Sequence, residues 1–258
     1  MGERLTLFHP ADDQDVYWAD YWRSFDFESL GSTSGFSSLG ELGPTFARYL
    51  RKGESILEAG CGAGRIVAAL LAEGFEVSGI ERSEEVVAAV RQGAPFLDVS
   101  RGDVERLPLE DSSVGAYVSL GVVEHLEGGP RVALQEAARV LKPGGRAFVS
   151  VPYLNPLRAR HLRALEQAPP TALTFHQFYF SVEQLNAQLE AAGLVVEDHL
   201  PYAVEGFMVR EHPLFSRFWG SVACRERIKQ GWRKWFRHAP ASVRSRFAHM
   251  IMAVATKA

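Results

Sequence analysis

Cysteine is scarce in this sequence, and the scarcity excludes two classes of protein. The 258 residues include two cysteines, Cys61 and Cys224, which are too few for a disulfide framework or a cysteine metal site. No apolar run is long enough to cross a membrane, and the polar start of the chain lacks the apolar core of a signal peptide. We therefore expect a soluble cytoplasmic protein without a metal ion.

The net charge of −3 hides an uneven distribution of charge along the chain. Residues 208–246 contain ten Lys or Arg and two Glu, an excess of +8, so the rest of the chain carries −11. Four apolar residues recur there at helical spacing among the basic ones: Cys224, Ile228, Trp232 and Trp235. Such a helix can lie in a membrane interface, or its apolar stripe can pack on the protein. Peripheral membrane contact through 212–244 and a structural role both stay open.

Short apolar segments alternate with helical patterns from residue 55 onward. The segments that predict strands are 55–59, 75–81, 95–100, 114–120, 146–151, 194–200 and 249–256. The helical patterns are 65–73, a segment capped by Ser83, 130–141, and a segment in which Ser181 and Gln184 form a capping box. This alternation predicts an α/β fold with a mainly parallel sheet covered by helices on both sides.

The domain organisation follows from the same pattern. Residues 1–50 precede the first predicted strand and are expected to form an N-terminal helical cap. Residues 51–258 are expected to form one domain, with the basic segment as a helical insertion, 206–246, before the last strand. The stretch between 152 and 180 contains Pro152, Pro156, Pro169 and Pro170 and is expected to be rich in loops.

A glycine-rich loop follows the first predicted strand. Its sequence is Ile56-Leu57-Glu58-Ala59-Gly60-Cys61-Gly62-Ala63-Gly64-Arg65, with glycines at alternate positions and an acid two residues before the first. Glycine permits sharp turns and close approach of the backbone to a ligand, and a strand-to-helix junction presents amide groups to that ligand. Dinucleotide-binding loops instead read G-x-G-x-x-G. The spacing therefore argues against a nicotinamide oxidoreductase.

Further motifs follow in a fixed order. Glu81 ends the second predicted strand, where an acid can accept hydrogen bonds from both hydroxyls of a ribose. Gly102-Asp103-Val104 follows the third strand, where Asp103 can accept from an adenine amino group. The segment from Asp111 to Leu126 reads D-S-S-V-G-A-Y-V-S-L-G-V-V-E-H-L, and the run from Arg139 to Gly145 reads R-V-L-K-P-G-G.

Together these motifs resemble the small-molecule S-adenosylmethionine (SAM) methyltransferases of class I, the group related to the ubiquinone and menaquinone C- and O-methyltransferases. The resemblance covers about residues 54–200. It implies a Rossmann-like three-layer sandwich whose seven-stranded, mainly parallel sheet has an antiparallel last strand, which fits the segment 249–256. It also implies SAM as cofactor and S-adenosylhomocysteine as product.

The resemblance assigns cofactor-binding roles residue by residue. Glu58 corresponds to the acid that holds the methionine end of SAM, and Gly60, Gly62 and Gly64 allow close approach. Glu81 would bind the ribose. The remaining members of the expected cofactor site are Cys61, Arg65, Arg82, Asp103, Val104, Leu120 and Gly121.

Three residues are expected at the reacting end. Methyl transfer to a hydroxyl or an acidic carbon can require a general base, most often histidine. Glu124 and His125 follow the fourth predicted strand, at the edge where ligands bind in open α/β sheets. His176 precedes the capped helix at a place where related quinone methyltransferases also carry a histidine. For each of the three, a purely structural, hydrogen-bonded role is the competing interpretation.

Three aromatic residues form a cluster near the N-terminus. Trp18, Tyr21 and Trp22 fall on one helical face. They can shield a sulfonium, because cations favour aromatic faces, or they can seat the helix on the core, and both roles can hold together.

The sequence thus predicts methyl transfer from SAM to a small molecule, at oxygen ahead of carbon or nitrogen. One alternative is a lipid or quinone-like acceptor at the membrane surface, and another is a non-catalytic SAM-binding protein. Ser150-Val151-Pro152-Tyr153 is similar to the loop with which nucleic-acid amino-methyltransferases hold a flipped base. It follows the fifth strand rather than the fourth and lacks the second proline, which argues against nucleic acid.

Overall fold

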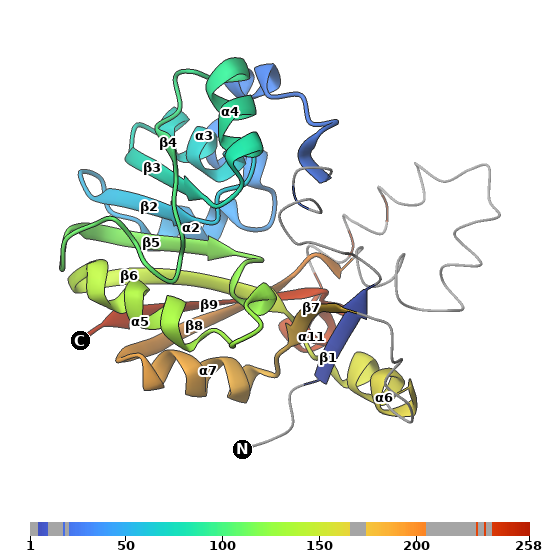
Figure 1. The fold of residues 1–258 in the computed structure, drawn as a ribbon. Helices are drawn as coiled ribbons and strands as arrows, with labels where there is room; N and C mark the ends of the chain where they lie inside the picture. Colours follow the sequence, from blue (N-terminus) through green and yellow to red (C-terminus); the bar gives the residue numbers. More distant parts are fainter. Residues whose placement is uncertain are drawn as a thin grey trace.

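The computed structural model describes residues 5–9, 18, 21–165, 174–204, 231, 235 and 239–258. Its main sheet has seven strands in the order β4-β3-β2-β5-β6-β9-β8 (Figure 1). The strands are β2 (Ser55–Ala59), β3 (Glu76–Glu81), β4 (Val99–Arg101), β5 (Val114–Leu120), β6 (Leu141–Pro152), β8 (Leu194–Tyr202) and β9 (Met250–Lys257). Strand β9 runs antiparallel to both of its neighbours, and the pairs from β4 to β6 are parallel.

Helices cover both faces of this sheet (Figure 1). One face packs on α5 (Arg131–Val140) and α7 (Val182–Ala191), and the other on α2 (Gly43–Tyr49), α3 (Arg65–Ala72) and α4 (Glu84–Gly93). Strand β9 contributes apolar side chains to both core layers, since Ile251 and Ala253 face one layer and Met252 faces the other. The predicted three-layer sandwich with an antiparallel last strand is therefore confirmed.

The helix caps predicted from the sequence are present in the structure. Ser83 caps α4 by accepting from the Val86 amide at 3.4 Å. Ser181 and Gln184 form the reciprocal capping box at the start of α7. Strand β5 has the predicted bounds, because its run of apolar residues is buried on both faces.

Two strands, β4 and β6, differ most from their predicted bounds. Strand β4 has three residues, since the segment 95–97 before it is irregular. Strand β6 begins directly after α5 and includes Pro143-Gly144-Gly145, which the sequence suggested would precede the strand. A register shift between Val114 and Ala116 on β5 accommodates these extra residues, as bulges do in other sheets.

The N-terminal segment contains the expected helical turns and one unexpected strand. The turns are η1 (Glu28–Ser32), η2 (Gly35–Leu39) and the helix α2. Strand β1 (Leu5–His9) pairs antiparallel with β7 (Thr174–Tyr179), which lies in the stretch expected to be loop (Figure 1). No local pattern predicts this pair, because each strand obtains its hydrogen bonds from a partner about 170 residues away.

The remaining elements are η3 (Val123–His125), α6 (Pro156–Leu165) and α11 (Ala241–Phe247). Of the predicted insertion 206–246, the structure describes residues 231, 235 and 239–246 only, so most of the basic helix expected at 212–244 lies outside the described residues. Helix α11 packs through Val243 and Phe247 against Val204. No helix within the described ranges has the length and apolar character needed to cross a bilayer.

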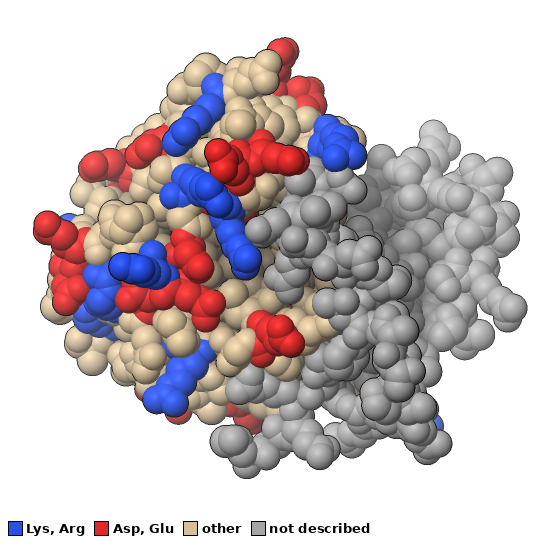
Figure 2. Space-filling model, viewed as in Figure 1, with Lys and Arg blue, Asp and Glu red and all other residues tan. Residues whose placement is uncertain are grey.

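Acidic and basic side chains alternate on the described part of the face shown in Figure 2. Several form close ion pairs, including Arg101 with Glu84 and Arg139 with Asp111, both at 2.8 Å. Exposed pairs of this kind contribute little to stability.

Candidate active site

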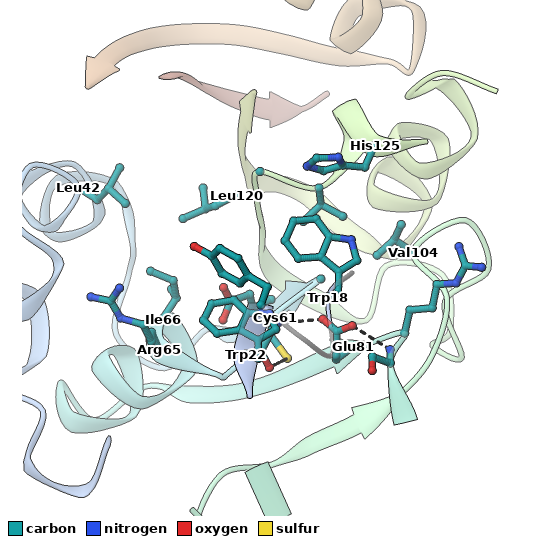
Figure 3. A pocket seen from close by; sticks show the side chains of 18 of the residues that line it. Trp18, Trp22, Leu42, Cys61, Arg65, Ile66, Glu81, Val104, Leu120 and His125 are labelled. Carbon is teal, nitrogen blue, oxygen red and sulfur yellow. Dashed lines mark hydrogen bonds between the residues drawn. The ribbon is translucent and has the colours of Figure 1, made fainter. Parts of the chain in front are cut away.

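A cavity of about 440 Å³ lies at the carboxyl ends of β2, β3 and β5 (Figure 3). Strand order reverses beside β2, because the chain proceeds outward to β3 and β4 and then returns to β5 on the other side. Ligands of open α/β sheets bind at such a switch point. The cavity is lined by Trp18, Tyr21, Trp22, Ser38, Leu39, Leu42, Glu58, Gly60, Cys61, Gly62, Arg65, Ile66, Glu81, Arg82, Ser83, Asp103, Val104, Leu120, Gly121, Val122, His125, Leu126 and Tyr202.

The glycine loop between β2 and α3 needs its glycines for two reasons. Gly60 and Gly62 have φ of +78° and +51°, which is the left-handed region that other residues rarely adopt. A Cβ on Gly60 would lie 2.4 Å from Val122 Cγ2, and one on Gly62 would lie 2.6 Å from Trp22 Cζ2. Both positions therefore need glycine for Val122 and Trp22 to pack against this backbone, which we call the glycine cradle.

Two buried or half-buried carboxylates hold this loop from neighbouring strands. Glu58 Oε2 accepts from the Val67 amide at 3.1 Å, so it caps the first turn of α3, whose N-cap, Gly64, has no side chain. Burial raises the pKa of Glu58, while the hydrogen bond from Val67 opposes this shift. Glu81 accepts from the amides of Gly62 and Ser83, both at 2.9 Å (Figure 3).

The structure brings most predicted site residues to one place. Every predicted cofactor residue except Gly64 lines the cavity, and among the three predicted catalytic residues His125 does so. Gly64 lies behind the loop, where a Cβ would meet Leu97 Cδ1 at 3.0 Å. Glu124 and His176 are not among the lining residues but lie next to His125.

The aromatic residues of the N-terminal segment lie over this cavity. Trp18, Tyr21 and Trp22 have helical backbone and line it. Their rings meet edge to face, with centroids 5.7 Å apart for Trp18 and Tyr21 and 4.9 Å for Tyr21 and Trp22. Trp22 also packs against the hydrophobic core. The cluster thus lines the cavity and seats the segment on the domain, as the two sequence interpretations allowed together.

Glu124, His125 and His176 form one group at the far side of the cavity. His125 Nδ1 lies 2.8 Å from the carbonyl oxygen of His176, and the two rings are 5.0 Å apart. His125 Nε2 lies 3.8 Å from Glu124 Oε1. Burial lowers the pKa of His125, and it raises the pKa of Glu124 to about 8. Near neutral pH both groups are therefore uncharged.

Several residues that complete the cavity wall were not predicted from the sequence. Leu39 and Leu42 come from η2 and the start of α2, and Tyr202 comes from the end of β8. The Tyr202 hydroxyl lies 2.9 Å from Ser150 Oγ. Strand β8 runs parallel to β6, so its carboxyl end reaches the same edge of the sheet as the predicted site. The predicted strand 194–200 ended two residues too early to include Tyr202.

The raised pKa of the buried Glu124 carboxyl predicts that the stability of the fold depends on pH. Between pH 4.5 and about 8 the unfolded chain ionises at Glu124 while the folded protein keeps the proton, so the folded state loses stability as pH rises, by up to about 1.4 kcal/mol per pH unit. Glu124→Gln removes this dependence. Its melting temperature should therefore rise relative to the wild type between pH 5 and pH 8.

Thermal unfolding of both proteins at pH 5, 6.5 and 8 measures this effect. Glu127→Gln is the matched control, because Glu127 is an exposed acid three residues along the chain. A constant difference between wild type and Glu124→Gln across this range would contradict the raised pKa.

The central part of the chain matches a known sequence family. The sequence family described as "Methyltransferase domain" matches residues 57–149, the stretch from β2 through most of β6 that builds the cavity floor. Over these residues the chain is similar in sequence to methyltransferase domains.

Two relatives and one solved structure illustrate the similarity. A probable S-adenosylmethionine-dependent methyltransferase of Mycolicibacterium smegmatis is 35% identical over 159 residues, covering 57% of this chain and 54% of the relative. A ubiquinone biosynthesis O-methyltransferase of Marinobacter nauticus is 29% identical over 146 residues, covering 50% and 61%. A chain in the complex of the Haloferax volcanii Trm112 methyltransferase activator with a methyltransferase superposes with a TM-score of 0.60 at 21% identity, covering 95% of this chain and 98% of that one.

The similarity has clear bounds. The chain spans about half the length of the curated relatives it matches. At 21% identity the structural likeness supports the fold, and the reaction must be argued from the site itself.

Proposed function

We propose that this protein is a SAM-dependent methyltransferase that acts on a small-molecule acceptor, at an oxygen atom. The observation that carries the proposal is the glycine cradle of Gly60 and Gly62, held by Glu81 at the switch point of the sheet and facing His125 across one cavity. A binding loop and a titratable group at the same edge of the sheet are what methyl transfer to a hydroxyl requires.

The residues present fit SAM. Gly60 and Gly62 line the cavity with backbone that carries no side chain, and carboxylates suit a cofactor that carries ammonium and sulfonium charges. Glu58 and the loop would hold the methionine end, Glu81 the ribose, Asp103 and Val104 the adenine, and Leu120 and Gly121 the methionyl backbone. SAM supplies an activated methyl group when bound. The protein's own task is to place the acceptor in line and to remove its proton.

The other half of the cavity favours an apolar acceptor with few polar groups. Its walls are Leu39, Leu42, Leu120, Val122 and Leu126, joined by the aromatic cluster. Figure 3 shows Leu42, Leu120 and His125 along one side, with Glu81 beyond the Trp18 and Trp22 rings. Ser38, His125 and Tyr202 are its polar side chains besides the aromatic cluster. This chemistry supports a hydroxylated, largely apolar molecule and agrees with oxygen as the acceptor atom.

Transfer of labelled methyl from SAM into a crude extract tests the proposal. Label in the organic phase would favour a lipid or quinone-like acceptor, and label in the aqueous phase would favour a polar metabolite. Label in the macromolecular fraction would contradict a small-molecule acceptor. Tight SAM binding without any transfer would favour the non-catalytic SAM-binding alternative.

Glu81→Gln tests the cofactor assignment. We expect it to weaken SAM binding 10- to 100-fold, because charge-assisted hydrogen bonds contribute roughly 1.5–3 kcal/mol, and because an amide can accept from only one of the two backbone groups that Glu81 binds. Isothermal titration with SAM measures the change. Glu84→Gln is the matched control, since Glu84 is exposed and pairs only with Arg101 in the described contacts. Unchanged affinity for Glu81→Gln would rule out the ribose role.

A further inference from the structure

We propose that a β-bulge in the β1–β7 pair fixes the tautomer of His125, so that Nε2 of this residue is the general base of methyl transfer. The proposal deepens the proposed function and rests on it. It assigns the chemistry to one atom, and it makes His176 a positioning residue that acts through its backbone.

The bulge is visible in the register of the two strands. Leu7 pairs with Gln177 and Phe8 with Phe175, so His176 alone among residues 174–179 has no partner on β1. The extra residue of a bulge is left out of the ladder, and bulges near active sites redirect the chain. The freed carbonyl of His176 accepts from His125 Nδ1 at 2.8 Å.

This hydrogen bond determines where the imidazole proton lies. A carbonyl oxygen can only accept, so Nδ1 of His125 must carry the hydrogen. In the neutral ring Nε2 then holds the lone pair, and burial favours that neutral ring by lowering the pKa of His125. The ring is also held in place by Trp18 and His176, whose ring centroids each lie 5.0 Å from it.

The titratable groups around His125 agree with this role. On its own element Glu124 is protonated near neutral pH, because burial raises the pKa of this carboxyl to about 8. His176 faces it from β7. From β8, the neutral Tyr202 hydroxyl faces the group, with its pKa raised by burial and by Glu124. Glu124 and Tyr202 are therefore both uncharged at pH 7.

The proposed step is a direct transfer of the methyl group to the acceptor oxygen. The acceptor hydroxyl gives its proton to His125 Nε2 while its oxygen forms a bond to the methyl carbon. The carbon–sulfur bond of the sulfonium breaks, and its electron pair stays on sulfur. His125 then returns the proton to water, so the positive charge of the site passes from cofactor to imidazole before it leaves.

The tautomer can be observed without any turnover. In the full-length protein labelled with ¹⁵N-histidine, long-range ¹H–¹⁵N correlation at pH 7 distinguishes the two neutral tautomers. Eight histidines contribute, and the one missing from His125→Asn is His125. We expect hydrogen on Nδ1, and hydrogen on Nε2 or a charged ring would overturn the proposal. Leu7→Pro, which interrupts β1 beside the bulge, should release the ring into a mixture of tautomers.

Measurements of methyl transfer test whether His125 is the general base. His125→Asn keeps an amide donor near the Nδ1 position but has no atom at Nε2, so methyl transfer should fall at least 100-fold with SAM affinity unchanged. His176→Ala keeps the carbonyl, so the hydrogen should stay on Nδ1 of His125 although the contact between the two rings is lost. Wild-type rates in His125→Asn would overturn the base. A wild type that transfers no methyl would instead contradict the proposed function, and the tautomer would still be measured.

Discussion

Replacing Gly62 with alanine should lower the affinity for SAM at least 100-fold. Gly62 has a φ of +51°, and an added Cβ would lie 2.6 and 2.8 Å from Cζ2 and Cε2 of Trp22. The left-handed conformation costs alanine roughly 1–2 kcal/mol, and the collision forces either the loop or the indole out of place. Both the cradle and the amide that Glu81 holds would be displaced.

Isothermal titration measures this loss, and two variants isolate its cause. Gly74→Ala has the same kind of strain, with φ of +80° and no atom within 4 Å of the added Cβ, so its affinity should match the wild type. In a Trp22→Ala background the Gly62→Ala change should cost less, because the ring that it meets is gone. A Gly62→Ala protein that binds SAM within threefold of the wild type would contradict the cradle.

Arg158→Met should destabilise the fold more than any exposed substitution. Arg158 is only 1% exposed. Its guanidinium donates to the carbonyls of Tyr153 and His249, lies 2.7 Å from His249 Nδ1, and covers the ring of Tyr179 at 4.7 Å. Methionine fills similar volume but removes the donor to the Tyr153 carbonyl, which costs about 1–3 kcal/mol, while the His249 carbonyl still accepts from the Tyr153 amide.

With the lost contact to the Tyr179 ring, the expected loss of about 2–4 kcal/mol corresponds to a fall in melting temperature of roughly 5–10 °C for a protein of this size. Thermal unfolding followed by circular dichroism measures it. Arg48→Met is the control, because Arg48 has a side chain 70% exposed and a single 3.4 Å ion pair with Asp198, worth less than about 1 kcal/mol. A fall below 2 °C for Arg158→Met would show that the cluster contributes little.

The parts of the fold that the sequence predicts are those with local causes. Strand β5 follows from seven consecutive residues that suit burial, and α7 follows from Ser181 and Gln184 three positions apart. The β1–β7 pair was missed because its cause is distant, since neither strand has a turn or an apolar partner close in sequence. Strand β6 was predicted too short because a proline and two glycines normally end an element, and here the register shift on β5 accommodates them.

The same division applies to the site. The cofactor half is built from consecutive strand ends, so the loop after Glu58 and the acid Glu81 could be read in order along the chain. The acceptor half is built from segments far apart, and Leu42 and Tyr202 meet only after the sheet is complete. His176 shows a subtler limit. The sequence indicated a catalytic role for its side chain. The structure instead places its backbone carbonyl, which every residue type carries, against His125.

The position of β9 has a consequence for synthesis. This strand lies between β6 and β8 in the sheet, yet it is the last of the three to be made. Until it arrives, β8 has no neighbour and β6 presents an open edge that can pair with other chains. The end of β8 carries Tyr202, so the acceptor wall waits for the same event. Ribosome-bound chains that stop before Met250 should therefore hold a finished cofactor half beside an aggregation-prone, unclosed sheet.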